Sequence, residues 1–483
     1  MLVRLVRLSI GVALVLGLSL SCGGALEQQF RAGAAKVDIT PKAWPVPLIG
    51  NFSFRPAVGA HDPLHSRAIV LDDGSVELAI AVVDSCYVAR RVLDQAKQLA
   101  SDSTGIPTSR MLISATHTHT APPAAASEGT RGIETQDLSE NESAYGELLV
   151  RGIADSIIEA HRRLEPAEAG WASTELADEV FNRRWHVEPG SIPPDPHGGT
   201  TDLVRMNPPR QSPDLIRPAG PTDPEIIFLS VRTAAGEPLA LLANYSLHYV
   251  GGIPPVQVSA DYFGEFARQV TDRLGAGAGF VGILSNGTSG DINNIDFTKP
   301  RPDVAPFEQA RRVAGKVADR VFDAYPSIEH RGALSLAMAE KELALGLRKP
   351  TEERYAHAKK VRAAIDHAKF PREAIYAQRA IDAFEGPESV DVKLQALRVG
   401  ELGIAALPFE TFVETGLDLK SKSPLKPMFT IELANGAEKY LPTPEHHDLG
   451  GYETWLGTNI VERQASVKIA EVLLELLNDV AVR

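Results

Sequence analysis

Residues 111–120 read MLISATHTHT, an apolar run that ends in two histidines one residue apart. The apolar half, residues 111–115, is typical of a buried strand. If the chain stays extended beyond it, His117 and His119 point to the same face, because side chains alternate along a strand. Two neighbouring imidazoles can bind a metal ion, or one can bind while the other transfers protons. Taken alone, the pattern is more often a pair of ordinary surface or packed histidines.

Apolar runs of strand length recur along the rest of the chain, with helical patterns between them. The expected strands are 66–71, 76–83, 111–115, 226–231, 239–245, 280–284, 334–339, 392–399 and 428–433. The expected helices are 90–101, 143–164, 260–274, 306–325 and 466–479. This mixture predicts an α/β domain in which helices cover the faces of mixed β-sheets. Residues 394–407 are expected to form a β-hairpin.

Two segments interrupt this pattern. Residues 185–224 are rich in proline, glycine and aspartate, which predicts a long surface loop. Residues 351–384 are charged and helical, with a break at Pro371. We expect each segment either to border a substrate cleft or to lie on the surface without a part in substrate binding.

The composition is that of a globular protein with a large core. The 483 residues are 44% hydrophobic and 23% charged, and no linker-like tract divides them. We therefore expect one large domain over residues 31–483. The formal net charge of −13 argues against nucleic-acid binding, which depends on lysine and arginine. It also argues against simple electrostatic docking on anionic lipid.

The N-terminal segment has the features of an export signal. Two arginines precede an apolar run, residues 8–20, which ends in small residues around Cys22. The run is shorter than the ~20 residues of a comfortable membrane span. We expect residues 1–22 to be a signal peptide and the mature protein to be periplasmic, secreted or an outer-surface lipoprotein tethered to a membrane through Cys22. The alternative is a cytosolic protein in which the segment is a buried helix.

The cysteines limit the kinds of metal site that the chain can form. Cys22 and Cys86 are the only two, which excludes a disulfide framework. They also exclude a multi-thiolate zinc site, so any metal must rely mainly on histidine, carboxylate or phenolate ligands.

Three further segments carry candidate site residues. His248 follows the apolar run 239–245, where a histidine is more often a satisfied core residue than a ligand. Glu410 follows the expected hairpin; if buried it needs a partner such as a metal, whereas at an exposed helix start it needs none. Residues 284–294 are crowded with glycine, hydroxyl and amide groups, which form a tight turn or face a substrate.

Taken in order, these segments resemble the neutral/alkaline non-lysosomal ceramidase family. Residues 32–41 are similar to the opening segment of that family. Residues 116–119 are similar to its T-H-T-H-S-G-P motif, and residues 181–184 to its N-R-S motif. The same order continues through His248, the 284–294 loop, Glu410 and a tyrosine segment. The resemblance spans roughly residues 31–465.

The resemblance implies a zinc hydrolase that cleaves the amide bond of an N-acyl substrate, ceramide or a related lipid amide. The implied ligands of one Zn²⁺ ion are His117, His248, Glu410 and Tyr440. Tyr440 is assigned because Tyr452 follows it by twelve residues, as a second functional tyrosine does in the family. Zinc lowers the pKa of a bound water toward ~7, and the hydroxide attacks the amide. His119 is the implied general base and acid, and Arg183 and Tyr452 are the implied donors to the oxyanion.

Three departures from the family pattern bear on the substrate. The family places a serine beside the zinc where an ungapped match puts Gly287, so Thr288 and Ser289 are the candidate substrate-binding hydroxyls. Residues 120–122 differ from the S-G-P ending. The best-known members carry a C-terminal immunoglobulin-like domain, which we do not expect here because the sequence ends at Arg483 after a helix. The alternatives are a zinc esterase or deacetylase for a non-lipid substrate, and a non-catalytic exported binding protein on the same scaffold.

Overall fold

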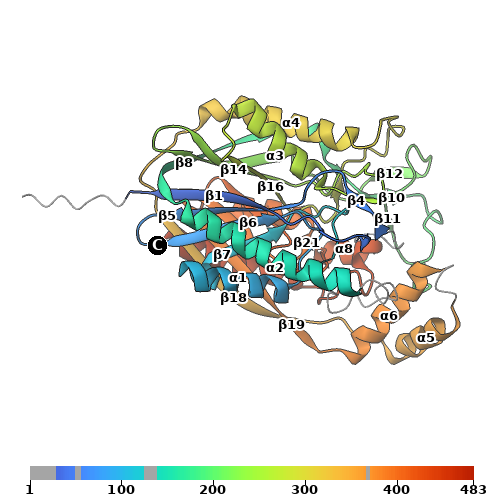
Figure 1. Ribbon diagram of the computed structural model, residues 1–483. Helices are drawn as coiled ribbons and strands as arrows, with labels where there is room; N and C mark the ends of the chain where they lie inside the picture. The colour runs from blue at the N-terminus through green and yellow to red at the C-terminus, as the bar shows by residue number, and fades with distance from the viewer. Residues whose placement is uncertain (1–28, 49–55, 124–138, 366–369) are drawn as a thin grey trace, which may run out of the picture.

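The computed structural model describes residues 29–48, 56–123, 139–365 and 370–483 (Figure 1). The predicted signal peptide, with Cys22, lies outside this part of the chain. Among the described helices, none combines the length and the hydropathy of a membrane span.

An eight-stranded sheet forms the centre of the fold. Its strand order is β16-β14-β13-β8-β1-β5-β6-β7. Neighbouring strands are antiparallel except for the outermost pairs, β6–β7 and β14–β16, which are parallel. The strands are β1 (Arg31–Asp38), β5 (His65–Asp72), β6 (Glu77–Val83), β7 (Met111–Ala115), β8 (Glu165–Glu175), β13 (Glu225–Thr233), β14 (Pro238–Tyr245) and β16 (Val281–Asn286).

A second, four-stranded sheet packs against one face of the first. Its order is β18-β19-β20-β22, with β18 (Leu336–Gly346), β19 (Ser389–Val399), β20 (Leu402–Ala406) and β22 (Met428–Ile431). One apolar cluster joins the two sheets: Ile80 and Leu112 of the large sheet belong to it together with Leu397, Ile404 and Phe429 of the small one. One part of the protein core therefore lies between the two sheets.

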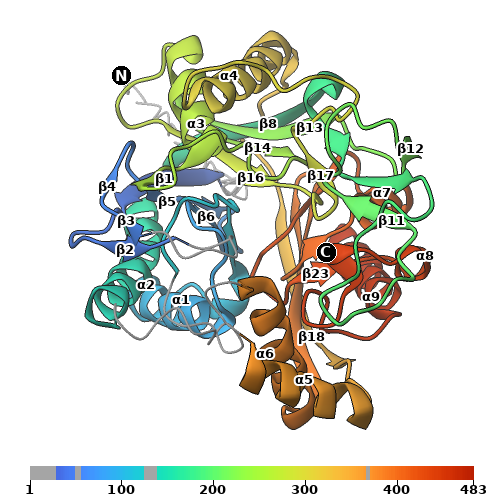
Figure 2. The same ribbon diagram turned by 90° about the vertical axis from the view of Figure 1, so that its right-hand side faces the viewer.

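Helices cover the two outer faces (Figure 2). The pairs α1–α2 and α3–α4 pack on the outer face of the large sheet, and α9 packs on the outer face of the small sheet. The helices are α1 (Arg90–Thr104), α2 (Ser139–Arg162), α3 (Asp261–Leu274), α4 (Glu308–Ala324), α5 (Glu352–Ala364), α6 (Pro371–Glu385), α7 (Val413–Lys422), α8 (Pro444–Leu449) and α9 (Ala465–Ala481). These layers confirm the predicted α/β class, with mixed sheets covered by helices.

The layers explain why β6 reads as a continuous apolar run. Ala79 and Ala81 point toward the helices, whereas Leu78, Ile80 and Val82 point toward the second sheet. Because both faces are covered, neither set of alternating side chains can be polar.

Shorter elements complete the structure. The two-stranded pairs are β2 (Val46–Pro47) with β3 (Pro56–Ala57), β4 (Gly59–Ala60) with β15 (Gln257–Val258), β9 (Phe181–Asn182) with β17 (Ile292–Asn293), and β21 (Glu410–Thr411) with β23 (Tyr440–Leu441). The 3₁₀ helices are η1 (Thr108–Arg110), η2 (Ala177–Glu179), η3 (Tyr325–Ser327) and η4 (Tyr452–Thr454).

The two irregular segments behave differently. Residues 351–384 form α5 and α6, and Pro371 begins α6, as the sequence predicts. The prediction of a long loop over residues 185–224 is wrong in part, because this segment forms most of a three-stranded sheet. The sheet contains β10 (Arg184–Val187), β11 (Val204–Met206) and β12 (Leu215–Pro218). Strands of three or four residues are too short to produce a visible alternation of apolar and polar side chains.

Candidate active site

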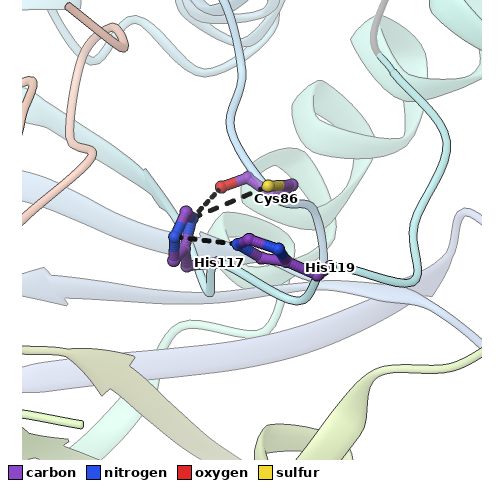
Figure 3. A group of neighbouring side chains, drawn as sticks. All are labelled: Cys86, His117 and His119. Atoms are coloured by element: carbon purple, nitrogen blue, oxygen red, sulfur yellow. Dashed lines mark hydrogen bonds between the residues drawn. The ribbon is translucent and has the colours of Figure 1, made fainter. Parts of the chain in front are cut away.

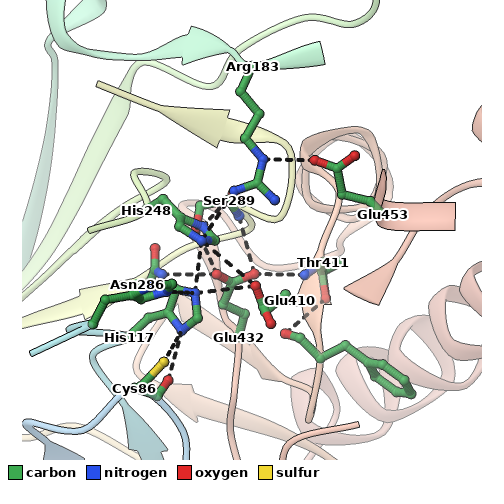
Figure 4. A network of polar contacts seen from close by, with 12 residues as sticks. Cys86, His117, Arg183, His248, Asn286, Ser289, Glu410, Thr411, Glu432 and Glu453 are labelled. Carbon is green, nitrogen blue, oxygen red and sulfur yellow. Dashed lines mark hydrogen bonds and ion pairs between the residues drawn. The ribbon is translucent and has the colours of Figure 1, made fainter. Parts of the chain in front are cut away.

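Segments that are far apart in the sequence meet where several strands end. The edge strands of the large sheet, β7 and β16, approach each other, so the residues that follow them come together. His117 follows β7, His248 follows β14 and Ser289 follows β16. Glu410 and Tyr440 come from the side of the small sheet and are direct partners in the parallel pair β21–β23. Figure 4 shows the resulting network.

The backbone turns sharply at His117. Its φ of 73° is left-handed, and its N–H donates to the carbonyl of Ser85 at 2.8 Å. The chain is therefore not extended here, and the prediction that strand alternation aligns the two histidines is wrong. The imidazoles meet all the same, with 3.1 Å between the Nε2 atoms of His117 and His119 and rings at 89° to each other (Figure 3).

Backbone carbonyls fix the tautomers of the two inner histidines. Nδ1 of His117 lies 2.8 Å from the carbonyl oxygen of Cys86, and Nδ1 of His248 lies 3.1 Å from that of Ser289. Since a carbonyl can only accept, each Nδ1 carries a proton, and each ring in its neutral form keeps a lone pair on Nε2. These two Nε2 atoms are 2.9 Å apart, so they are close enough to bind one metal ion together.

The carboxylate of Glu410 completes the cluster. Its Oε2 lies 3.2 Å from Nε2 of His117 and 3.7 Å from Nε2 of His248. The same oxygen is buried, and the Glu410 carboxyl also bonds to the phenol of Tyr440. Four ligands 2.0–2.1 Å from a tetrahedral zinc ion are about 3.3 Å apart, close to the separations observed. The donor set therefore fits Zn²⁺.

Tyr440 lies beside this cluster as its strand pairing with Glu410 requires. The guanidinium carbon of Arg183 is 5.3 Å from the centre of the phenol ring. Burial raises the pKa of Tyr440 well above its ordinary value, although the charge of Arg183 acts in the opposite direction. A phenolate at this position needs a further positive charge, which a divalent ion would supply.

Arg183 is held rigidly at the edge of the cluster. Its Nε donates to Glu453 at 2.8 Å, and the neighbouring Arg184 donates to the other oxygen of Glu453 at 2.6 Å. One terminal nitrogen of Arg183 lies 3.3 Å from Nε2 of His248, and the guanidinium also bonds to the phenol of Tyr440. Burial opposes the charge of Glu453, but the two arginines lower its pKa below the ordinary value. A fixed, buried guanidinium is suited to stabilise an oxyanion.

The other predicted residues lie at different distances from this centre. His119 stacks on Tyr249, with ring centroids 3.8 Å apart. Tyr452 packs on Tyr440, with centroids 5.6 Å apart. Thr288 instead packs against Gly416 of α7, where any Cβ would collide with its hydroxyl. Its role in substrate binding stays a prediction, as does that of Ser289.

Three comparisons with known proteins bear on this site. Residues 30–187 match the family described as neutral/alkaline non-lysosomal ceramidase, N-terminal. Over 162 residues, 32% of this chain, the sequence is 26% identical to neutral ceramidase B of Dictyostelium discoideum. That match spans 22% of the relative, so it covers about a fifth of that protein's length.

The structure resembles the crystal structure of neutral ceramidase from Pseudomonas aeruginosa, with a TM-score of 0.67 and 18% identity. That likeness covers 94% of this chain and 74% of the other. A ceramidase complexed with C2 gives a TM-score of 0.66 and 17% identity over 94% of this chain and 75% of the other. The predicted resemblance to the neutral/alkaline ceramidase family is confirmed, in sequence over residues 30–187 and in fold over 94% of the chain.

The ceramidase family model and the ceramidase fold cover different parts of the site. The family model includes His117, His119 and Arg183. The remaining candidates lie beyond residue 187, where the likeness to the ceramidases is one of fold: His248, Ser289, Glu410, Tyr440 and Tyr452.

Three residues of this ceramidase-like site were missed from the sequence. Glu432 directly follows the apolar strand β22, and nothing in the sequence around it indicated a site residue. Glu453 could have been found, because two consecutive buried arginines require a buried anion. Tyr249 directly follows His248, and only the fold shows that its ring stacks on His119.

Proposed function

We propose that this protein is a zinc-dependent amidohydrolase that cleaves the amide bond of an N-acyl lipid such as ceramide. The observation that carries the proposal is the convergence of His117, His248 and Glu410, whose ligand atoms lie within 4.8 Å of one another. The relationship to the ceramidase family supports the choice of a lipid amide as substrate.

The ligands of the ion would be His117, His248, Glu410 and Tyr440. When bound there, zinc supplies Lewis-acid activation of water and of the amide carbonyl. The carbonyls of Cys86 and Ser289 hold the two imidazoles in the tautomer that this role needs.

His119 is placed to move the proton. Its Nε2 borders the cluster, and its stacking on Tyr249 fixes the plane of the ring. It takes a proton from the attacking water and returns it to the nitrogen of the leaving amine. The buried N–H group of Arg183, together with the hydroxyl of Tyr452, stabilises the negative charge that develops on the carbonyl oxygen.

The proposal includes export. Residues 1–22 would be removed as a signal peptide; in a lipoprotein, cleavage would instead fall directly before Cys22, which would then carry the lipid. Intact-mass measurement of the mature protein purified from cells distinguishes a lipidated, a cleaved and an uncleaved N-terminus.

The test combines metal analysis with substrate turnover. Purified protein should contain one zinc per chain and should release fatty acid from ceramide faster than from the corresponding ester. His117→Ala and Glu410→Ala should lose both zinc and turnover, whereas Asp72→Asn, at a buried carboxylate paired with Arg31 at the end of β5, should retain both. Full zinc content and full activity in the first two variants would refute the proposal. Preferential cleavage of the ester would replace the amidase by an esterase.

A further inference from the structure

Glu432 is a buried carboxylate behind the proposed metal centre, and it is fully enclosed. Its Oε1 accepts from the hydroxyl of Ser289 at 2.7 Å and from the side-chain amide of Asn286 at 2.9 Å. Its Oε2 accepts from the backbone N–H groups of Thr411 at 2.8 Å and Ser289 at 3.2 Å. Four donors therefore converge on one carboxylate, two on each oxygen.

These contacts join two walls of the site that carry different ligands. Ser289 belongs to the loop after β16, which holds His248. Thr411 directly follows Glu410 in β21. Glu432 is the side chain that bonds to both segments, as the centre of Figure 4 shows.

The contact with Ser289 continues to a metal ligand. Nδ1 of His248 lies 3.1 Å from the carbonyl oxygen of Ser289 and 3.4 Å from its hydroxyl oxygen. Because the hydroxyl donates its proton to Glu432, it presents a lone pair to the Nδ1–H group of His248. The polar chain runs from the Glu432 carboxylate through the Ser289 hydroxyl to the imidazole, and ends at Nε2 in the cluster.

We propose that Glu432 is a positioning residue for the metal centre, acting through Ser289 to orient His248 and through Thr411 to place Glu410. The inference rests on the proposed metal centre and deepens it. In metal sites, a carboxylate behind a histidine ligand fixes the ring and strengthens its binding, and removal of such a partner typically costs about 10- to 100-fold in metal affinity.

The experiment measures zinc dissociation constants by competition with a chromogenic chelator for the wild type and three variants. Glu432→Gln keeps the shape but turns an amide N–H₂ toward donors, and should weaken zinc binding about 10- to 100-fold. Ser289→Ala keeps the backbone carbonyl and removes only the hydroxyl link, so its loss should be smaller. Asp72→Asn makes the same carboxylate-to-amide change at another buried position and should leave the affinity unchanged.

The double variant separates positioning from general loosening of the fold. If Glu432 acts through Ser289, the effects of Glu432→Gln and Ser289→Ala on zinc affinity are coupled, and the double variant loses less than the product of the single losses. If Glu432→Gln fails to fold, Ser289→Ala alone must still weaken zinc binding. Wild-type affinity in Ser289→Ala and in a folded Glu432→Gln overturns this inference and leaves the proposed centre standing. Absence of zinc binding in the wild type overturns the proposed function itself, and this inference with it.

Discussion

Glu410 pairs directly with Tyr440 in the two-residue parallel ladder β21–β23, so that one backbone contact places a carboxylate and a phenol side by side. Neither strand is longer than two residues. The proximity of these two side chains therefore depends on the elements that pack around the ladder.

Tyr440→Phe should weaken zinc binding about 10-fold or more while leaving the fold intact, because the substitution removes the phenolic oxygen and keeps the buried ring. Chelator competition measures the affinity, and circular dichroism confirms the fold. Tyr355→Phe removes an exposed hydroxyl bonded to Glu385 and serves as the matched control. Equal zinc affinity in Tyr440→Phe and wild type would remove Tyr440 from the ligand set.

Gly290→Ala should disturb Glu410 through the backbone. A Cβ at Gly290 would lie 2.5 Å from the carbonyl oxygen of Glu410, and a backbone atom cannot rotate away. We expect a loss of about 1–3 kcal/mol in the free energy of unfolding, together with weaker zinc binding. Gly277→Ala, where a Cβ meets nothing within 4 Å, should change neither quantity. Denaturant unfolding and metal titration check both, and wild-type behaviour of Gly290→Ala would contradict the steric argument.

Arg183→Lys should lower kcat about 100- to 1,000-fold with a smaller effect on KM, as loss of an oxyanion donor does. Lysine keeps a positive charge near Glu453 but lacks the planar guanidinium that bonds Glu453 and borders His248 at the same time. Steady-state kinetics with ceramide provide the measurement, and Arg210→Lys, a partly exposed arginine bonded to the carbonyl of Asp296, is the control. A kcat within twofold of wild type would exclude this role.

Zinc should raise the thermal stability of the wild type. Free zinc at 100 times its dissociation constant stabilises the folded state by about 2.7 kcal/mol, because the unfolded chain lacks the assembled site. His117→Ala should abolish the zinc-dependent rise in Tm, whereas His357→Ala, at an exposed position of α5, should not. Differential scanning calorimetry with and without chelator tests this, and an unchanged Tm for the wild type would count against a metal centre.

Lys97 should make stability depend on pH in the alkaline range. Its amino group is buried and donates to Asn435 at 2.7 Å; burial, helped by the charge of Lys393, lowers its pKa from 10.5 to about 7. Between pH 7 and 10.5 the unfolded chain binds more protons at this residue than the folded chain, so the free energy of unfolding rises with pH there.

The contribution of Lys97 has a slope of up to about 1.4 kcal/mol per pH unit. Lys97→Met should remove this contribution, so the free energy of unfolding of the wild type should rise relative to that of the variant from pH 7.5 to 9.5. Parallel pH profiles from urea unfolding would show that the lysine is charged in the fold.

The long apolar strands and amphipathic helices could be predicted because burial imposes its own periodicity on the sequence. The strands β8 and β1 were missed, since their alanine, glycine and glutamate residues have low strand propensity and owe their conformation to the neighbouring strands. The hairpin β19–β20 was predicted correctly, with Gly400 in the left-handed conformation at its turn.

The candidate ligands could be named in advance because their residue types and order resemble a known family, and the structure brings all four together. Their geometry could not be predicted. The left-handed turn at His117 and the contact between β7 and β16 arise from long-range packing that no local pattern reports. The role of Glu432 could not be predicted for the same reason, because its four donors come from segments more than 20 residues away along the chain.

The four candidate ligands come partly from the side of the large sheet and partly from the side of the small one. This has a consequence for biosynthesis. His117 and His248 emerge from the ribosome early, but the carboxylate of Glu410 and the phenol of Tyr440 follow much later. A nascent chain therefore cannot assemble the full ligand set before residue 440 has been made. The metal would be acquired by a chain that already contains the strands of both sheets.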